Sequence, residues 1–157
     1  MRDKISFVTR GALIAAFYAV LTFIFQPISF GQCQVRVSEA LALTPVLWPE
    51  AIPGLFVGCF IANVLGGYGP WDIFLGSAAT LFAAFLARKA KNDFLAAASP
   101  VVVNALVVGF YMSYVAGGMS TFMWMLSVGF GETVACFVLG VPLLRFLRRA
   151  RFSGQKK

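Results

Sequence analysis

The chain has 157 residues, of which 60% are hydrophobic and 12% are charged, and its mean hydropathy is +0.84. A water-soluble domain of this length could not bury so much apolar surface, so the composition predicts an integral membrane protein. One membrane-crossing helix takes about 20 apolar residues, which leaves room for about six spans and no soluble catalytic domain.

The formal net charge is +7, and a strongly positive charge can also indicate a nucleic-acid-binding protein. Here the basic residues lie in short clusters between apolar runs, so we expect membrane topology, and no nucleic-acid partner, to explain them. Histidine is absent and the three cysteines, Cys33, Cys59 and Cys136, are far apart. These residues can assemble neither a zinc-type cluster nor a Cys/His catalytic pair, so we expect no metal and no cofactor, and interpret the cysteines as small apolar packing residues.

In chain order, the apolar runs predict one all-α domain over residues 1–157, with spans at 8–25, 38–48, 51–65, 73–87, 94–116 and 122–146. The first run is followed by no small-residue cleavage pattern, so we expect it to remain as a span. The second and third runs are short and are separated only by Trp48, Pro49 and Glu50. Each is marginal as a full crossing and could be tilted, broken or partly re-entrant, which leaves a range of five or six spans.

The basic residues decide between these numbers, because Lys and Arg are enriched on the cytoplasmic side. Every basic residue except Arg36 belongs to one of three clusters. These are Arg2, Lys4 and Arg10; Arg88, Lys89 and Lys91; and Arg145, Arg148, Arg149, Arg151, Lys156 and Lys157. All three clusters can be cytoplasmic only with six spans and both termini inside. We therefore predict a multi-pass protein of the cell membrane.

On this topology the six acidic residues divide evenly. Asp3, Glu50 and Asp93 fall on the cytoplasmic side, where solvation accounts for them, whereas Glu39, Asp72 and Glu132 fall in the outward half. Glu132 lies in FGETVACFVLG, with no basic residue before Arg145. An ionisable group at such depth normally faces a bundle interior or a cavity, so Glu132 is either a ligand-binding residue or a glutamate that ties helices together.

Arg36 and Glu39 lie in QCQVRVSEALAL, at the outer start of the second span. They either bind a ligand or form a local ion pair, with Ser38 as N-cap. Asp72 follows a turn that contains Gly67 and Gly69, and there a helix N-cap is the better interpretation than a ligand-binding role.

Amide and aromatic side chains add to this set. Asn63 ends the third span, where its amide would be costly to bury without a partner. Asn104 lies near the middle of the fifth span and could serve either an interhelical hydrogen bond or a ligand. Tyr111 could belong, with Tyr114 and Trp124, to the aromatic belt of the membrane interface.

The polar residues of the outer half point to one conclusion when taken together. Structural polar residues would not be expected to favour one leaflet, so we expect an outward-facing pocket lined by amides, carboxylates and aromatic rings. A small, planar, nitrogen-rich and cationic ligand suits such a pocket. The predicted members are Arg36, Glu39, Asn63, Asp72, Asn104, Tyr111 and Glu132.

The first span carries small residues at four-residue spacing, as Gly11, Ala15 and Ala19 and as Ala12 and Ala16. Such a face allows close approach of another helix. It serves either packing within the bundle or docking of a partner.

Three stretches, QCQVRVSEALAL (32–43), IANVLGGYGPWDIFLGSAATL (61–81) and GFGETVACFVLGVPLL (129–144), give the chain a family resemblance. It resembles the QueT family of queuosine-precursor transporters, which are substrate-binding S components of energy-coupling factor (ECF) transporters. The resemblance implies a six-helix subunit that binds a deazaguanine, in particular the aminomethyl form, and has no ATPase site of its own. A transmembrane coupling (T) protein and two ATPase subunits would drive its reorientation, with Ala12 and Ala16 docking on the coupling protein.

The resemblance also implies that either Glu39 or Glu132 binds the guanine-like edge of the ligand. The other of these two glutamates, or Asp72, would then bind the amine. Two other classes stay open. One is a proton-coupled secondary carrier with Glu132 as its proton site, and the other is a non-transporting assembly subunit in which the polar residues join helices.

Overall fold

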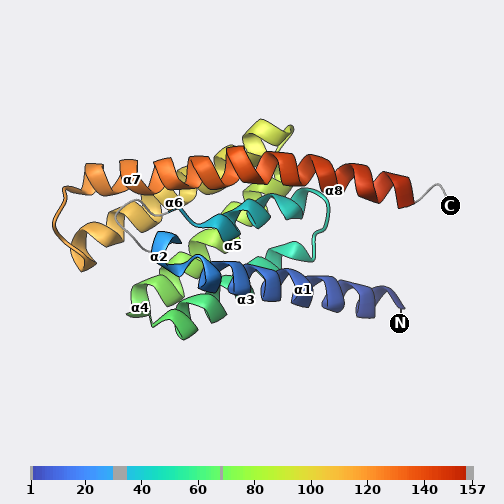
Figure 1. Cartoon of the computed structure of the whole chain (residues 1–157), viewed down its shortest axis with the longest axis horizontal. Helices are drawn as coiled ribbons and strands as arrows, with labels where there is room; N and C mark the ends of the chain where they lie inside the picture. The colour runs from blue at the N-terminus through green and yellow to red at the C-terminus, as the bar shows by residue number, and fades with distance from the viewer. Residues whose placement is uncertain (1, 30–34, 68, 155–157) are drawn as a thin grey trace.

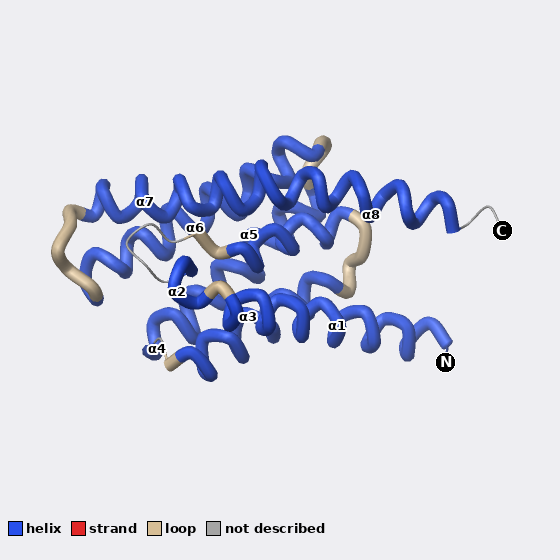
Figure 2. The backbone as a smooth tube through the Cα atoms, viewed as in Figure 1, coloured by secondary structure: helices blue, strands red, loops and turns tan. Residues whose placement is uncertain are grey.

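The computed structural model describes residues 2–29, 35–67 and 69–154, and these residues form helices without any strand (Figure 1, Figure 2). The all-α prediction is therefore confirmed. Cys33 and the ends of the basic clusters at Lys156 and Lys157 lie outside the described residues.

The helices follow the order of the predicted apolar runs. They are α1 (Arg2–Ile24), α2 (Gln26–Ser29), η1 (Val37–Val46), α3 (Ala51–Gly66), α4 (Gly69–Trp71), η2 (Asp72–Gly76), α5 (Ser77–Lys89), α6 (Asp93–Val115), α7 (Thr121–Thr133), η3 (Val134–Gly140) and α8 (Val141–Gly154). Here η1 is a 3₁₀-helix and η2 and η3 are π-helical segments. The chain runs without a break from α4 into α5 and from α7 into α8.

Four stretches of the described chain are long and apolar enough to cross a membrane, namely Lys4–Ile24, Gly69–Lys89, Asp93–Val115 and Thr121–Arg151. The predicted runs at 38–48 and 51–65 form shorter apolar helices, Val37–Val46 and Ala51–Gly66. Their shortness agrees with the expectation that either one alone is marginal as a crossing.

Helices α1 and α3 touch through their backbones. A Cβ atom built on Gly54 would lie 2.5 Å from the carbonyl oxygen of Gly11, and one on Gly58 would lie 2.7 Å from that of Ala15. Small residues four apart allow this approach, which maximises dispersion contacts where lipid offers no hydrophobic driving force. The Gly11 and Ala15 face of the first span thus serves packing within the bundle.

Helix η1 lies in the centre of the bundle, where seven of its ten residues are buried. Its last carbonyl groups have no partner within the helix, and two arginines from other helices supply hydrogen bonds. Arg88 donates to the carbonyl oxygens of Pro45 and Val46 at 2.9 and 3.1 Å, and Arg151 donates to that of Leu47 at 2.7 Å. A cation at a helix C-terminus also interacts favourably with the helix dipole.

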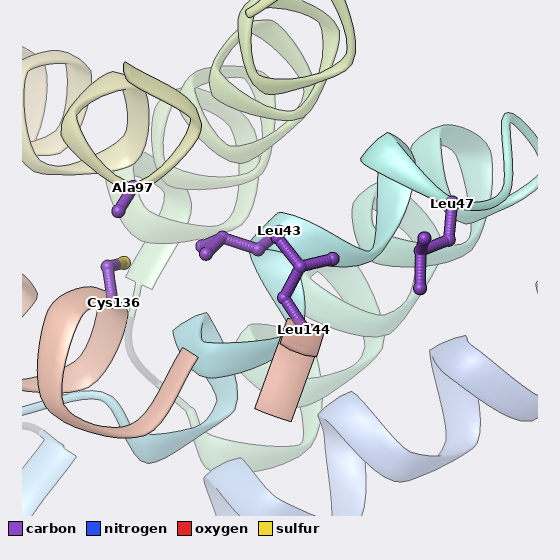
Figure 3. Packing of buried hydrophobic residues seen from close by; sticks show 5 residues of the cluster. All are labelled: Leu43, Leu47, Ala97, Cys136 and Leu144. Carbon is purple, nitrogen blue, oxygen red and sulfur yellow. The ribbon is translucent and has the colours of Figure 1, made fainter. Parts of the chain in front are cut away.

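One apolar cluster joins η1 to the second half of the chain (Figure 3). Leu43 and Leu47 meet Ala97 of α6, Cys136 of η3 and Leu144 of α8. The cluster holds the middle of the long α7–α8 helix against η1, and so determines which side chains of that helix face the interior.

Both described chain ends lie at the same end of the bundle (Figure 1). Two ion pairs connect this end of the bundle to the turns at 47–50 and 90–92. Arg10 of α1 pairs with Glu50 at 3.1 Å, and Arg148 of α8 pairs with Asp93 at 2.7 Å. We call this end, which collects the three predicted basic clusters, the basic end.

The acidic residues of the basic end differ from expectation. Glu50 is buried and Asp93 is partly buried, so solvation does not account for them. Each is instead held by an arginine from a distant part of the chain, which compensates for the water that the carboxylate loses.

Candidate functional site

Polar side chains are concentrated inside the helical bundle. All seven residues predicted for the site are buried, with at most 4% of each exposed: Arg36, Glu39, Asn63, Asp72, Asn104, Tyr111 and Glu132. Burial of polar and charged groups is costly unless they are paired, so their partners show what the arrangement can do.

Four of these residues form a network at the end of the bundle opposite the basic end. The Arg36 guanidinium lies 3.1 Å from Asp72 Oδ1, and the Tyr111 hydroxyl donates to the same oxygen at 2.8 Å. Asn63 donates through Nδ2 to the backbone oxygen of Asp72 at 2.7 Å. The start of η1, the end of α3, the start of η2 and the last turns of α6 are thereby joined.

The turn between α3 and α4 brings Asn63 to Asp72. Gly67 and Gly69 adopt left-handed backbone angles, with φ of 68° and 85°. Glycine reaches this region without steric cost, and Gly67 closes α3 by donating to carbonyl groups of its last turn. The predicted glycine turn is therefore confirmed, and its function is to fold η2 back onto α3.

Two capping interpretations from the sequence are wrong. Asp72 is not an N-cap, because α4 already begins at Gly69, and its carboxylate pairs with Arg36 instead. Ser38 is not an N-cap either, because η1 begins after Arg36 and the Ser38 hydroxyl accepts a hydrogen bond from Thr22. In both cases a distant partner replaces the local one.

Glu39 lies deeper in the bundle than the network around Asp72. Its Oε1 accepts a hydrogen bond from the Tyr18 hydroxyl, and the Thr80 hydroxyl lies 3.3 Å from the same atom. Its second oxygen, Oε2, is buried and has no hydrogen-bond partner among the described residues. A buried carboxylate oxygen in this condition is an acceptor without a donor.

Glu132 lies near Glu39, on the other side of Cys136. The Cys136 thiol lies 3.7 Å from the backbone oxygen of Glu39 and 3.8 Å from Glu132 Oε2. Asn104 of α6 donates through Nδ2 to Glu132 Oε1 at 2.9 Å. The amide oxygen of Asn104 is also buried without a partner among the described residues. The π-helical segment η3 begins two residues after Glu132, and such segments are frequent at functional sites.

The cysteines are not merely apolar packing residues, which corrects the sequence interpretation for Cys59 and Cys136. Cys59 Sγ lies 3.5 Å from both Asn63 Nδ2 and Thr80 Oγ1, and Cys136 contacts the two glutamates. Both are free thiols in the polar interior.

Tyr18 and Thr80 also belong to the site, and neither is among the residues predicted from the sequence. Tyr18 and Thr22 are polar residues in an otherwise apolar span, four positions apart and therefore on one helix face. Hydroxyl groups in a membrane span, like ionisable groups, are therefore a signal that predicts interior positions such as these.

The aromatic residues divide between the interior and the surface. Tyr111 and Trp124 are buried and hydrogen-bonded, with Trp124 Nε1 donating to the Gly117 carbonyl oxygen at 3.0 Å. Tyr114 is 74% exposed, as expected for an interfacial aromatic residue. It lines a surface pocket together with Tyr111 and Trp71, directly beside the Asp72 network.

The second small-residue face of α1 points away from the bundle. Ala12 and Ala16 are exposed, whereas Ala15 is buried against α3. The two interpretations of the first span thus apply to different faces: Gly11 and Ala15 pack internally, and Ala12 and Ala16 remain open to a partner or to lipid.

The comparisons with known proteins agree with the helical, membrane-compatible architecture. Residues 8–149 match the model of the family described as QueT transporter, which confirms the resemblance seen in the sequence. No curated protein and no solved structure matches the chain significantly. The family match extends over nearly all of the described helices, so the chain belongs to the QueT transporter family and is a membrane transport protein.

Proposed function

We propose that the chain is the substrate-binding S subunit of an ATP-driven ECF importer and captures a queuosine precursor, the aminomethyl deazaguanine, from outside the cell. Membership of the QueT transporter family supports a transport role. The chemistry of the buried polar residues supports the substrate class.

The observation that carries the substrate proposal is the orphan oxygen Oε2 of Glu39. It is buried, the Cys136 thiol lies between the Glu39 backbone oxygen and the Glu132 carboxylate, and the Asn104 amide oxygen is likewise buried without a partner among the described residues. Both orphans are acceptors, so a fitting ligand brings N–H donors. A guanine-like edge presents an N–H and an amino group side by side, and an aminomethyl group adds a cation.

The charges support the same ligand. Among the described residues of the polar interior, three buried carboxyl groups, Glu39, Asp72 and Glu132, accompany one buried guanidinium, that of Arg36. Asp72 is already paired with Arg36 and accepts a hydrogen bond from Tyr111. The proposal therefore assigns Glu39 and Glu132 to the ligand and treats Arg36, Asp72, Asn63 and Tyr111 as the frame at its outer side.

The proposed topology has six crossings with both termini in the cytoplasm. A 3₁₀-helix of ten residues reaches about 20 Å at 2.0 Å per residue, and α3 with 16 residues reaches about 24 Å. Both are shorter than the hydrocarbon core of about 30 Å, and the polar turns at their ends would extend them across it. The common position of the chain ends supports an even number of crossings (Figure 1).

Ligand binding by the purified subunit tests the substrate. A panel of deazapurines and vitamins is titrated, and the aminomethyl deazaguanine is expected to bind best. Glu39→Gln and Glu132→Gln each replace an acceptor by an amide that presents a donor to the ligand, and loss of a hydrogen bond to a charged group predicts about a tenfold to hundredfold weaker affinity. Asp93→Asn, the same change at the basic end, is the control and should bind normally.

If no deazapurine binds, the substrate assignment is wrong even where the transporter class holds. If Glu132→Gln and Asp93→Asn bind equally well, Glu132 joins helices and does not contact the ligand.

Partner capture tests the coupling. The proposal predicts that a transmembrane coupling protein and two ATPases co-purify with the tagged chain, and that Ala12→Leu with Ala16→Leu abolishes this without unfolding the subunit. Proton-driven uptake by the chain alone in liposomes would instead establish a secondary carrier.

A further inference from the structure

The basic end contains a cavity that the proposed transport function does not use. It has a volume of about 520 Å³ and lies between the turn at 90–92 and the start of α8. Its charged lining consists of Lys91, Arg145, Arg148 and Asp93. Volumes of about 300–1,000 Å³ are typical of small-molecule sites, so the cavity is large enough for a phosphate-bearing headgroup.

The charges in this cavity do not balance. Arg148 makes two hydrogen bonds to Asp93, at 2.7 and 3.3 Å, and Arg145 Nε lies 3.7 Å from the same carboxylate. One carboxylate therefore faces three cationic groups, which include Lys91 on the adjacent turn. Arg145 is two-thirds exposed and Lys91 is exposed, so both are able to turn toward an anion.

Asp93 orients Arg148 and can balance the charge of only one of the three cations. Its bidentate contact orients Arg148 across the gap between α6 and α8. The start of α6 also borders the cavity, and the positive end of its dipole adds to the attraction for an anion. Asn92 caps this helix by accepting from the Leu95 amide at 2.8 Å.

The position of the cavity indicates which anions reach it. Phe94, on its wall, is 66% exposed and packs on Phe137 of η3, as expected for a side chain at the boundary of the hydrocarbon region. Basic pockets between membrane helices at this level bind anionic lipid headgroups. We propose that the cavity lined by Lys91, Arg145 and Arg148 is a binding site for a phosphate monoanion, supplied by the headgroup of an anionic lipid.

Native mass spectrometry of the purified full chain tests the site, with phosphatidylglycerol and phosphatidylcholine as probes. The zwitterionic headgroup brings its own cation into a cationic cavity, so phosphatidylglycerol is expected to be retained in preference. Lys91→Gln with Arg145→Gln removes two of the three cations, and at about 1 kcal/mol for each the affinity falls about thirtyfold. Arg148 is left unchanged because it holds Asp93.

The matched control is Lys89→Gln with Arg149→Gln. It removes the same charge, from the last residue of α5, two positions before Lys91, and from α8, but neither residue lines the cavity. It is expected to keep most of the affinity for phosphatidylglycerol. Equal losses in the two double variants, or equal retention of the two lipids by the natural chain, would overturn the proposal, because attraction would then be a property of the whole basic surface.

Thermal unfolding with inorganic phosphate distinguishes the source of the anion. Phosphate that stabilises the natural chain but not the Lys91 and Arg145 double variant, without retention of phosphatidylglycerol, supports the site with free phosphate as its ligand. Lys91→Gln alone, at an exposed turn, provides a second variant should the double variant fold poorly; unchanged binding by it would count against the site.

Discussion

Gly54 of α3 lies directly against the backbone of Gly11 of α1. A methyl group on Gly54 would meet the Gly11 carbonyl oxygen at 2.5 Å and its carbonyl carbon and Cα at 3.2 Å, and none of these atoms can rotate away. The distance between the first and third helices is therefore set by the absence of a side chain. It places Tyr18, one turn beyond Ala15, within reach of Glu39.

Gly54→Ala is expected to force α1 and α3 apart and to lower the free energy of unfolding by about 1–3 kcal/mol, the usual cost of overpacking. Thermal unfolding of the purified protein measures this. Ala16→Val, which enlarges a residue on the exposed face of α1, serves as the control and should leave the unfolding temperature nearly unchanged. A wild-type unfolding temperature for Gly54→Ala would show that the two helices are not in backbone contact.

Arg36→Met leaves the Asp72 carboxylate buried without its guanidinium partner. Breaking a buried ion pair in this way costs about 3–5 kcal/mol, so a large loss of stability is expected. Combining it with Asp72→Asn removes the uncompensated charge and should restore part of the loss. A double-mutant cycle on unfolding free energies gives the coupling, and strictly additive effects would argue against the ion pair.

Arg88→Gln removes the hydrogen bonds that close the C-terminal end of η1. Hydrogen bonds from charged groups contribute about 1.5–3 kcal/mol, and the expected loss of stability lies in that range. Lys89→Gln removes the neighbouring exposed cation but makes no hydrogen bond to η1, so its effect should be small. Chemical denaturation of both variants gives the comparison, and equal effects would mean that charge alone, and not capping, matters.

Tyr18→Phe removes the donor that orients the Glu39 carboxylate. Within the proposed function this makes Tyr18 a positioning residue, and the expected result is about a tenfold weaker affinity for the deazaguanine, together with a loss of stability because the buried Glu39 carboxylate loses a donor. Thr22→Val removes another buried hydroxyl of α1, which bonds to Ser38 and does not touch Glu39. Isothermal titration of both should show a loss for Tyr18→Phe only; parallel losses would assign both hydroxyls to packing.

Much of the architecture is predictable because hydropathy and charge act locally. A helix in lipid must satisfy its own backbone, so an apolar run bounded by charge or by a glycine turn becomes a helix wherever it lies in the bundle. The helices at 51–66 and 93–115 begin and end within one residue of their predicted runs, and the first helix ends within one residue of its run but begins six residues earlier. The seven polar residues predicted for the site are all buried, because polar groups in an apolar run turn away from lipid.

The pairing of these residues depends instead on how distant helices pack. Local spacing allowed Arg36 to pair with Glu39 and favoured Asp72 as a helix cap, yet the ion pair joins Arg36 to Asp72, and Glu39 accepts a hydrogen bond from Tyr18. Helical periodicity determines which residues share a face, but the depth and rotation of one helix against another depend on close contacts such as Gly54 on Gly11. Hydropathy and charge thus predict a helical membrane protein with one basic end and a polar interior. The packing of distant helices decided which acceptors in that interior remain without donors.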